Sequence, residues 1–260
     1  MEPLIVISKE NEASQCIKSA LLRMVKFDEE GRDFWRYSGF CMAEYGGRIV
    51  DIIPSHEASC YIFASTHRSE SGKPCFTAHT PGNWGAADLG GNPRTLNTAS
   101  ASALRAAIME MKRLSDLSLK WQVCLEAVHH GPSLGKPVLF VEVGSGPGQW
   151  QNLQAGEIAA RGVIAAATAK QLPSAHVGFG GTHYCPKFTA LLFEGKAFGN
   201  IISGYALERD GCDEEMVRMA LSQNSEKIES TLIDWKGIKG EARRELVGTL
   251  DSIGAKWERA

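Results

Sequence analysis

The sequence lacks several features that would assign it quickly to a functional class. No stretch approaches the roughly 18 consecutive apolar residues of a transmembrane helix, and the apolar run near the N-terminus is too short for a signal peptide. The seven cysteines are odd in number, scattered singly and form no CxxC pair, as expected for reduced thiols. These absences predict a cytoplasmic protein that does not associate with membranes.

An excess of charge of one sign is also lacking. The 28 Lys and Arg residues nearly balance the 30 Asp and Glu residues, which argues against a generally basic nucleic-acid coat protein but permits a local basic patch. The sequence has no repeat, low-complexity tract or obvious linker. We therefore expect residues 1–260 to form a single domain and the protein to be a monomer.

Apolar segments alternate with amphipathic ones along the chain. Helices are expected at 14–26, with Ser14 as the N-cap, and at 98–118, 155–170 and 214–224; strands are expected at 3–8, 48–53, 60–65, 74–80, 121–128, 137–143, 175–180 and within 230–237. The runs at 121–128 and 137–143 are almost continuously apolar, which is typical of strands buried on both faces of a sheet. This order predicts an α/β fold with three α/β/α layers and a central mixed, largely parallel sheet.

Five of the seven histidines lie at or just after the end of a predicted strand. Ligands bind at the carboxyl edge of the strands in open α/β sheets, where parallel strands would gather these side chains. The five are His67, His79, His129, His130 and His183, whereas His56 and His176 are expected to be ordinary hydrogen-bonded residues.

Two glutamates lie in the most apolar of the predicted strands. A carboxylate such as Glu126 or Glu142 is costly to bury unless it is paired, protonated or bound to a metal. One explanation is a buried ion pair, for example with Arg105 or Lys136. The other is a metal site, because neutral imidazole nitrogens and carboxylate oxygens form a zinc-type ligand set.

The stretch CLEAVHHGP (124–132) brings a carboxylate and two imidazoles to one place. If the chain stays extended, Glu126 and His130 share one face and His129 points to the other. The turn at Gly131 and Pro132 can redirect His129 toward Glu126. No HExxH motif or cysteine cluster is present, so this spacing alone does not define the ligands.

The turn GFGGTHY (178–184) is rich in glycine. Gly180 and Gly181 let the backbone approach a ligand and can present N–H groups to an anion, although a plain tight turn is the alternative. The order GxGxxG is missing, which argues against a dinucleotide site. Asn83, four residues after His79, can orient a carbonyl or a water molecule.

Five motifs in this order resemble those of the archaeal and plant type of D-aminoacyl-tRNA deacylase: THRSESGKP…TAHTPGN (66–83), EAVHHGP (126–132), FVEVGSGPGQW (140–150), GFGGTHY (178–184) and DWKG (234–237). The resemblance implies an enzyme that hydrolyses the ester joining a D-amino acid to the 3′ end of tRNA, in translation quality control. It also implies zinc, with one or two ions per subunit, and a phosphorylase/hydrolase-like fold. The acceptor end of D-aminoacyl-tRNA is then the partner.

We assign roles within these motifs from the chemistry of the side chains. The expected metal ligands are His79, His129, His130, Glu142 and His183. The expected catalytic residues are Glu126 as general base, Asn83 as oxyanion donor, and His67; the expected substrate-binding residues are Ser69, Gly180, Gly181 and Tyr184.

Other positions bear on the partner and on rival functions. Relatives often have His where this chain has Asn200, which would leave an amide at one metal position. Candidate tRNA contacts are Lys112, Arg113, Lys120, Lys236, Lys239, Arg243 and Arg244. The rival functions are a metal-dependent peptidase or amidohydrolase of related fold, and a non-catalytic RNA- or nucleotide-binding protein.

Overall fold

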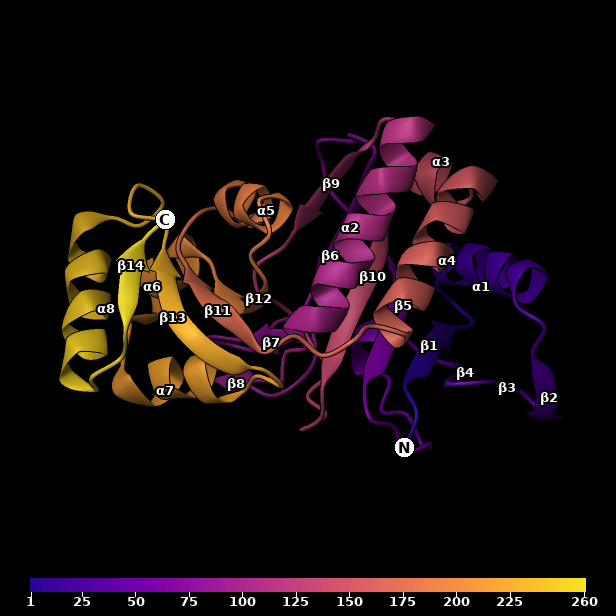
Figure 1. Ribbon diagram of the computed structural model, residues 1–260, viewed down its shortest axis with the longest axis horizontal. Coiled ribbons are helices and arrows are strands. Elements are labelled where there is room, and N and C mark those ends of the chain that lie inside the picture. The colour runs from indigo at the N-terminus through magenta and orange to yellow at the C-terminus, as the bar shows by residue number, and fades with distance from the viewer.

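The computed structural model describes residues 1–260 and contains two main β-sheets (Figure 1). The larger sheet has the order β2-β3-β4-β1-β5-β10-β6-β9, formed by β1 (Leu4–Ser8), β2 (Asp28–Gly31), β3 (Phe34–Tyr37), β4 (Phe40–Tyr45), β5 (Tyr61–Thr66), β6 (Cys75–His79), β9 (Gln122–Leu125) and β10 (Val138–Gly144). The smaller sheet has the order β12-β11-β13-β14, formed by β11 (Ser174–Phe179), β12 (Phe198–Ile202), β13 (Lys227–Ile233) and β14 (Trp257–Arg259). The two short strands β7 (Gly82–Asn83) and β8 (Thr95–Leu96) pair with each other in a separate antiparallel sheet.

Parallel pairing predominates in both sheets. Four of the seven strand pairs in the larger sheet are parallel, and the antiparallel ones are β2–β3, β3–β4 and β6–β10. All three pairs of the smaller sheet are parallel. The predicted α/β class with a mixed, largely parallel sheet is confirmed, and the structure adds that the strands divide into two sheets.

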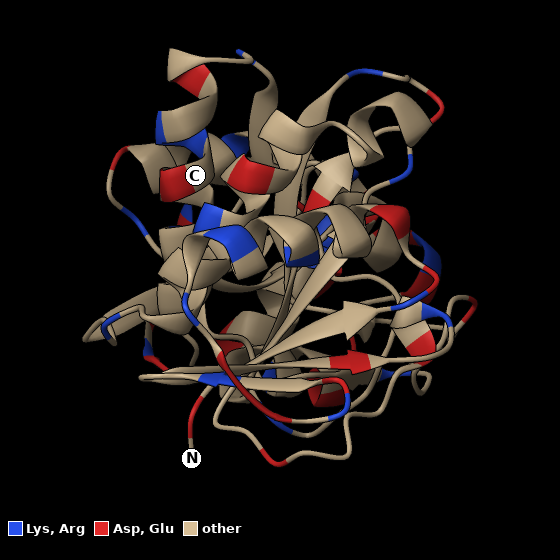
Figure 2. Ribbon diagram, turned by 90° about the vertical axis from the view of Figure 1, so that its right-hand side faces the viewer, with Lys and Arg blue, Asp and Glu red and all other residues tan.

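The helices connect and cover these sheets. They are α1 (Glu12–Met24), α2 (Ala101–Leu117), α3 (Pro147–Trp150), α4 (Leu153–Ala167), α5 (Pro186–Phe193), α6 (Gly204–Asp210), α7 (Glu214–Ser222) and α8 (Gly240–Ser252), with a 3-10 turn η1 (Ile49–Asp51). None of them is both long and apolar enough to span a bilayer. Acidic and basic residues are interspersed along the chain in the view of Figure 2, as the balanced composition predicts.

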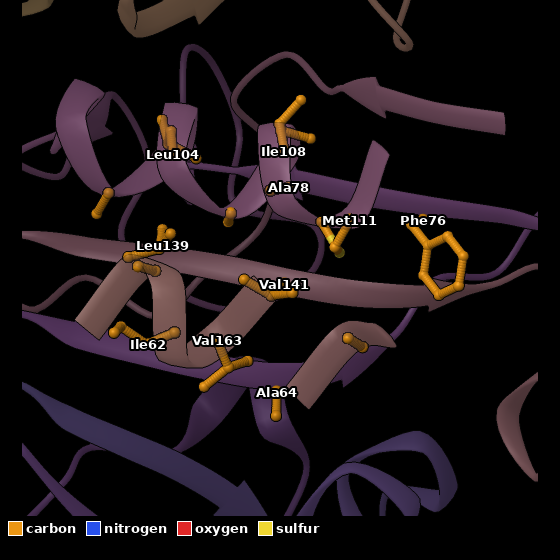
Figure 3. Close-up of a cluster of buried hydrophobic side chains, with 14 of the residues drawn as sticks. Ile62, Ala64, Phe76, Ala78, Leu104, Ile108, Met111, Leu139, Val141 and Val163 are labelled. Atoms are coloured by element: carbon orange, nitrogen blue, oxygen red, sulfur yellow. The ribbon is translucent and has the colours of Figure 1, made fainter. Parts of the chain in front are cut away.

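The main apolar core lies between one face of the larger sheet and helices α1, α2 and α4. Met111 of α2 and Val163 of α4 belong to the same buried cluster as Val141 of β10 (Figure 3). A Cβ atom at Gly162 would lie only 2.7 Å from Cγ of Met111, so this glycine lets α4 pack closely against α2. The small residues of α4 therefore allow close packing between the two helices.

The opposite face of the larger sheet is covered without a long helix. Ile49 and Ile52 pack there in one cluster with Val6, Phe63 and Phe140. The strand expected at 48–53 is wrong, because these isoleucines bury their side chains from η1 and its flanks without pairing to another strand. In the smaller sheet, α6, α7 and α8 cover one face and α5 lies on the other.

The first helix begins earlier than expected. The Asn11 side chain caps α1 by accepting a hydrogen bond from the Ser14 amide at 2.9 Å. Ser14 is therefore not the N-cap, and its hydroxyl instead accepts a hydrogen bond from the Ser8 amide at 2.9 Å. This contact joins the helix to the end of β1.

Candidate metal centre

Strand alternation places the candidate residues on one face of the larger sheet. In β10, Leu139 and Val141 belong to the helix-covered core, so Glu142 points to the opposite face together with Phe140. The same alternation puts His67 and His79 on the face of Glu142, because their strand neighbours at alternate positions face the helices. Strands β6 and β9 run antiparallel to β5 and β10, so the carboxyl ends of the two pairs lie at opposite edges of the sheet. His67, His79 and Glu142 therefore come together because they share a face of the sheet, not because they share a carboxyl edge.

The segment after β9 is held by the smaller half of the molecule. Strand β9 ends at Leu125, and the Ala127 amide donates to the His183 carbonyl at 2.9 Å. The Val128 amide donates to the Ile201 carbonyl at 2.8 Å. These bonds bring His183, which follows β11, against the larger sheet.

Of the two arrangements left open for the adjacent histidines, the structure shows the one in which the chain turns and His129 lies toward Glu126. His130 has a left-handed backbone conformation, with φ 50°, so the extended alternation stops before it. As a result His129 lies beside Glu126, whereas Nε2 of His130 lies 3.2 Å from Nε2 of His79.

Glu126 occupies the centre of the cluster. Its Oε1 lies 3.0 Å from His67 Nδ1, and its Oε2 lies 3.1 Å from His183 Nε2, 3.5 Å from His129 Nε2 and 3.7 Å from His79 Nδ1. Neither oxygen makes a hydrogen bond of good geometry, although Glu126 is only 2% exposed. A buried carboxylate in this state calls for a cation or a proton.

The hydrogen bonds of His129 and His130 fix where their lone pairs point. Nδ1 of His129 lies 2.8 Å from the Ala127 carbonyl oxygen, and Nδ1 of His130 lies 2.6 Å from that of Gly131. A carbonyl only accepts, so each Nδ1 carries the proton and each Nε2 carries the lone pair. The His129 lone pair therefore faces the Glu126 carboxylate.

No neutral tautomer of His79 satisfies all its neighbours. A proton on Nε2 bonds to His130 but leaves the Nδ1 lone pair facing Glu126; a proton on Nδ1 leaves two Nε2 lone pairs face to face. Burial, together with the charges of His129 and His130, lowers the pKa of His79 well below its usual value. A cation among these atoms would resolve the conflict, so the donor set fits a metal ion.

The protonation states agree with such a site. Burial and the neighbouring His130 lower the pKa of His129 to about 3. Burial acts to raise the pKa of Glu126, but its contacts with His183 and His67 outweigh this and hold it well below the usual range. Neutral imidazoles and an ionised carboxylate are the forms that bind zinc.

His67 differs from the other histidines. Burial opposes its protonation, but the adjacent carboxylates of Glu126 and Glu142 outweigh that effect and raise its pKa to about 12. Glu142 Oε2 lies 3.6 Å from Nδ1 of His67, and the Tyr184 hydroxyl lies 2.9 Å from Nε2. His67 therefore forms a charged link between the two carboxylates and Tyr184.

Three sets of three residues bring potential ligand atoms within 4.8 Å of one another. They are His79, His129 and His130; His67, Glu126 and His183; and His79, Glu126 and Glu142. All five predicted metal ligands thus fall in these sets, together with Glu126 and His67. His56 and His176 lie outside them and bond to Tyr45 and Ser230.

The predicted oxyanion donors are already used within the protein. The amide nitrogen of Asn83 donates to the carbonyls of Gly90 at 2.9 Å and Asn92 at 3.1 Å. Gly180 N–H donates to the Ile202 carbonyl at 2.7 Å, and Gly181 N–H donates to that of Gly237 at 3.0 Å. These groups hold loops in place and have no proton left for a substrate.

Other residues singled out in the sequence lie outside the cluster. The Ser69 hydroxyl contacts Ser71 in the turn after β5 and has no bond to the cluster. Asn200 donates to the Gln223 carbonyl at 2.6 Å, so its amide serves the packing of β12. Lys136 pairs with Glu57, and Arg105 pairs with neither buried glutamate, so the example partners are wrong and the ionic partner of Glu126 and Glu142 is His67.

Many of the basic residues expected at a tRNA surface have acidic or aromatic neighbours. Lys112 pairs with Asp116, Arg113 with Glu110 and Lys239 with Glu208. The guanidinium of Arg243 lies over the Trp235 ring, 4.5 Å from its centroid. The charges of Lys112, Arg113 and Lys239 are therefore partly neutralised by their acidic neighbours.

A pocket of about 130 Å³ opens beside His129 and His130. Its other walls come from the loop after β6, including Trp84 and Asp88, and from Tyr205 and Arg209 of α6. Sequence reasoning missed Trp84, Tyr205 and Arg209, because none of them belongs to a chemically distinctive motif.

Comparison with known proteins gives consistent results. The family model for D-aminoacyl-tRNA deacylase matches residues 54–258. A D-aminoacyl-tRNA deacylase of Pyrococcus furiosus is 40% identical over 198 residues, which cover 75% of this chain and 72% of that protein. One of Methanosarcina barkeri is 36% identical, with 96% of this chain and 87% of that protein covered.

A solved structure, described as that of a conserved protein of unknown function, has nearly the same fold. It superimposes with a TM-score of 0.89 and 27% identity, and the match covers 99% of this chain and 95% of the other. The family match covers every motif of the histidine cluster. The chain belongs to the D-aminoacyl-tRNA deacylase family.

Proposed function

We propose that this protein hydrolyses the ester bond of D-aminoacyl-tRNA with the help of one zinc ion, releasing the free D-amino acid and the tRNA. The observation that carries the zinc part is the conflict around Glu126 and His79, where lone pairs face a carboxylate or each other in every neutral tautomer. The family supplies the substrate. A monomeric, cytoplasmic protein remains part of the proposal.

His79, His129 and His130 would hold the ion. Three neutral histidines with an open fourth position are a known ligand set of catalytic zinc. The other two candidate sets both require Glu126, which we assign to proton transfer. His129 and His130 also line the pocket, so a substrate in the pocket would reach this set directly.

Zinc in such a set supplies an activated water at neutral pH and polarises the carbonyl of the ester. Glu126 accepts the proton that the attacking water loses, at the Oε2 atom near His129 and His183. His67 keeps Glu126 ionised and is itself held by Glu142 and Tyr184. We thus assign Glu142 and His183 to positioning these groups.

Hydrolysis of D-tyrosyl-tRNA and L-tyrosyl-tRNA by the purified protein tests the proposal. Rates are measured before EDTA treatment, after it, and after zinc is restored, with zinc content determined on the same samples. We expect hydrolysis of the D form alone, loss with EDTA and recovery with about one equivalent of zinc. Full activity in zinc-free protein would reject the metal, whereas equal rates on both forms would reject the stereochemical selectivity.

Peptides and N-acyl amino acids serve as control substrates. The proposed enzyme should leave them intact, because the ester of an aminoacyl-tRNA is much more reactive than an amide. Turnover of peptides but not of charged tRNA would favour the peptidase alternative.

A further inference from the structure

The pocket beside His129 and His130 has a wall whose function the ester chemistry does not explain. Tyr205, in the first turn of α6, is 46% exposed although it is a large aromatic residue. Arg209, one helical turn later, lies on the same lining. Both face a cavity that is continuous with the candidate metal ligands.

The backbone fixes Tyr205 in position. The Gly204 amide donates to the Gly181 carbonyl at 2.9 Å, and Gly181 in turn donates to Gly237. A Cβ atom on Gly204 would collide with the Gly237 carbonyl, so only glycine allows this approach. The glycine-rich motifs at 178–184 and 234–237 thus seat the start of α6 rather than bind an anion.

Arg209 and the facing loop are fixed as well. Nε and Nη2 of Arg209 contact the Asp210 carboxylate, at 3.0 and 2.8 Å from Oδ2. Asp210 packs onto Gly85, where a Cβ would collide with the carboxylate. The Trp84 indole donates to the Gly211 carbonyl at 2.9 Å, which joins the loop after β6 to the end of α6.

We propose that this pocket binds the 3′-terminal adenosine of the tRNA, with its base stacked on the ring of Tyr205. The inference rests on the proposed function, in which the ester joins the amino acid to the ribose of that nucleotide. The terminal nucleotide must then lie next to the zinc-binding histidines. Exposed aromatic rings and arginine planes are the groups on which proteins stack unpaired bases.

A free donor group of Arg209 favours a nucleotide over an amino-acid side chain in this pocket. Arg209 offers the Nη1 group, which is not used by Asp210, to the phosphate that precedes the terminal nucleoside. An apolar D-amino-acid side chain has no group for this guanidinium to bind. Arg209 is already paired with Asp210, and Asp88 lies on the same lining, so the pocket has no excess of positive charge and we expect stacking to contribute more than phosphate attraction.

A cycle of protein variants and tRNA variants tests the inference by direct binding. Affinities of wild type and Tyr205→Ala are measured by fluorescence anisotropy for uncharged tRNA and for the same tRNA lacking its terminal adenosine. Removal of the adenosine should weaken binding to wild type about tenfold. Tyr205→Ala should bind full-length tRNA with an affinity lower by the same factor. It should bind the shortened tRNA with the same affinity as wild type.

Two variants serve as controls. Tyr205→Phe keeps the stacking surface and should bind like wild type. Tyr37→Ala removes a tyrosine of similar exposure, 40%, on β3 far along the larger sheet, and should change neither affinity. Arg209→Ala should make the fall of tRNA affinity with salt concentration less steep, by the amount that corresponds to about one lost phosphate contact.

The inference is overturned if Tyr205→Ala lowers the affinity for both tRNAs equally or for neither. It is also overturned if wild type binds the two tRNAs with equal affinity. Thermal unfolding of each variant shows that it is folded, and Tyr205→Leu replaces Tyr205→Ala if the latter is not. Failure of the proposed function has a different signature. In that case wild type would prefer the complete 3′ end but would not hydrolyse D-tyrosyl-tRNA.

Discussion

Replacing Glu126 by glutamine separates proton transfer from metal binding. The variant keeps the size and shape of a side chain that is 2% exposed, but it loses the charge and the ability to accept a proton from water. If Glu126 is the general base, deacylation should slow by about 10²–10⁴-fold. The three histidines remain, so the variant should still take up one equivalent of zinc.

The expected loss of zinc affinity follows from the position of the carboxylate. Glu126 Oε2 lies 3.5 Å from the His129 nitrogen that would bind the ion, so the carboxylate charge would stabilise a cation held by the three histidines. Loss of such a neighbouring group typically lowers metal affinity by about 10–100-fold, or roughly 1.4–2.8 kcal/mol. Zinc at 1,000 times its dissociation constant stabilises wild type by about 4 kcal/mol.

Calorimetry of zinc-free and zinc-loaded protein measures both quantities. For a protein of this size, 1 kcal/mol shifts the melting temperature by about 2–4 °C, so zinc should raise that of wild type by roughly 8–16 °C. At the same zinc concentration the shift for Glu126→Gln should be smaller by about 3–11 °C. Unchanged deacylation by Glu126→Gln would refute the assignment of the base. Complete loss of zinc at saturating concentration would show that Glu126 is a ligand.

Three further changes test other parts of the structure. His129→Ala should abolish both zinc uptake and deacylation, whereas His176→Ala, which alters a buried histidine bonded to Ser230, should keep both; metal analysis on each purified variant decides this. Gly181→Ala forces a side chain onto a backbone with φ 79°, and should destabilise the fold by about 1–2 kcal/mol in urea unfolding; an unchanged midpoint would contradict the role of the turn. Glu226→Ala removes the carboxylate that accepts hydrogen bonds from the Ala101 and Ser102 amides at the start of α2, and should cost about 1–3 kcal/mol without altering zinc content.

The fold class, four of the eight α-helices and seven of the fourteen strands could be predicted, because their sequence patterns are local. The continuous apolar run of β10 and the helical spacing of Leu104, Ile108 and Met111 in α2 both appear in the structure as expected. Strands β2 and β3 could not be recognised, because their residues are exposed or half-buried and lack an apolar pattern. The 3-10 turn at Ile49–Asp51 has the composition of a strand, and only its packing on the larger sheet distinguishes it.

The residues of the histidine and glutamate cluster could be predicted, but their geometry and the pocket wall could not. Burial of Glu126 and Glu142 in apolar strands already indicated an unusual environment, and strand alternation assigns Glu142 and His79 to one face. The sequence does not show that β9 ends at Leu125 or that His130 has a left-handed backbone conformation, so it left open which of His129 and His130 lies beside Glu126. The hydrogen bonds that occupy Asn83 and Gly181 are long-range contacts, which no local pattern reveals.

The position of the site between the two sheets gives it a specific dependence on the whole fold. The larger sheet supplies His79 and Glu142, while His183 and the wall with Tyr205 come from the smaller half. Only two backbone hydrogen bonds, from Ala127 to His183 and from Val128 to Ile201, join the segment from Glu126 to His130 directly to that half. Any change that separates the halves at this point would therefore remove His183 from Glu126 and the pocket wall from His129 together. Metal binding and recognition of the tRNA end should for this reason be lost in parallel when the junction is disturbed, and separately when Glu126 or Tyr205 is changed alone.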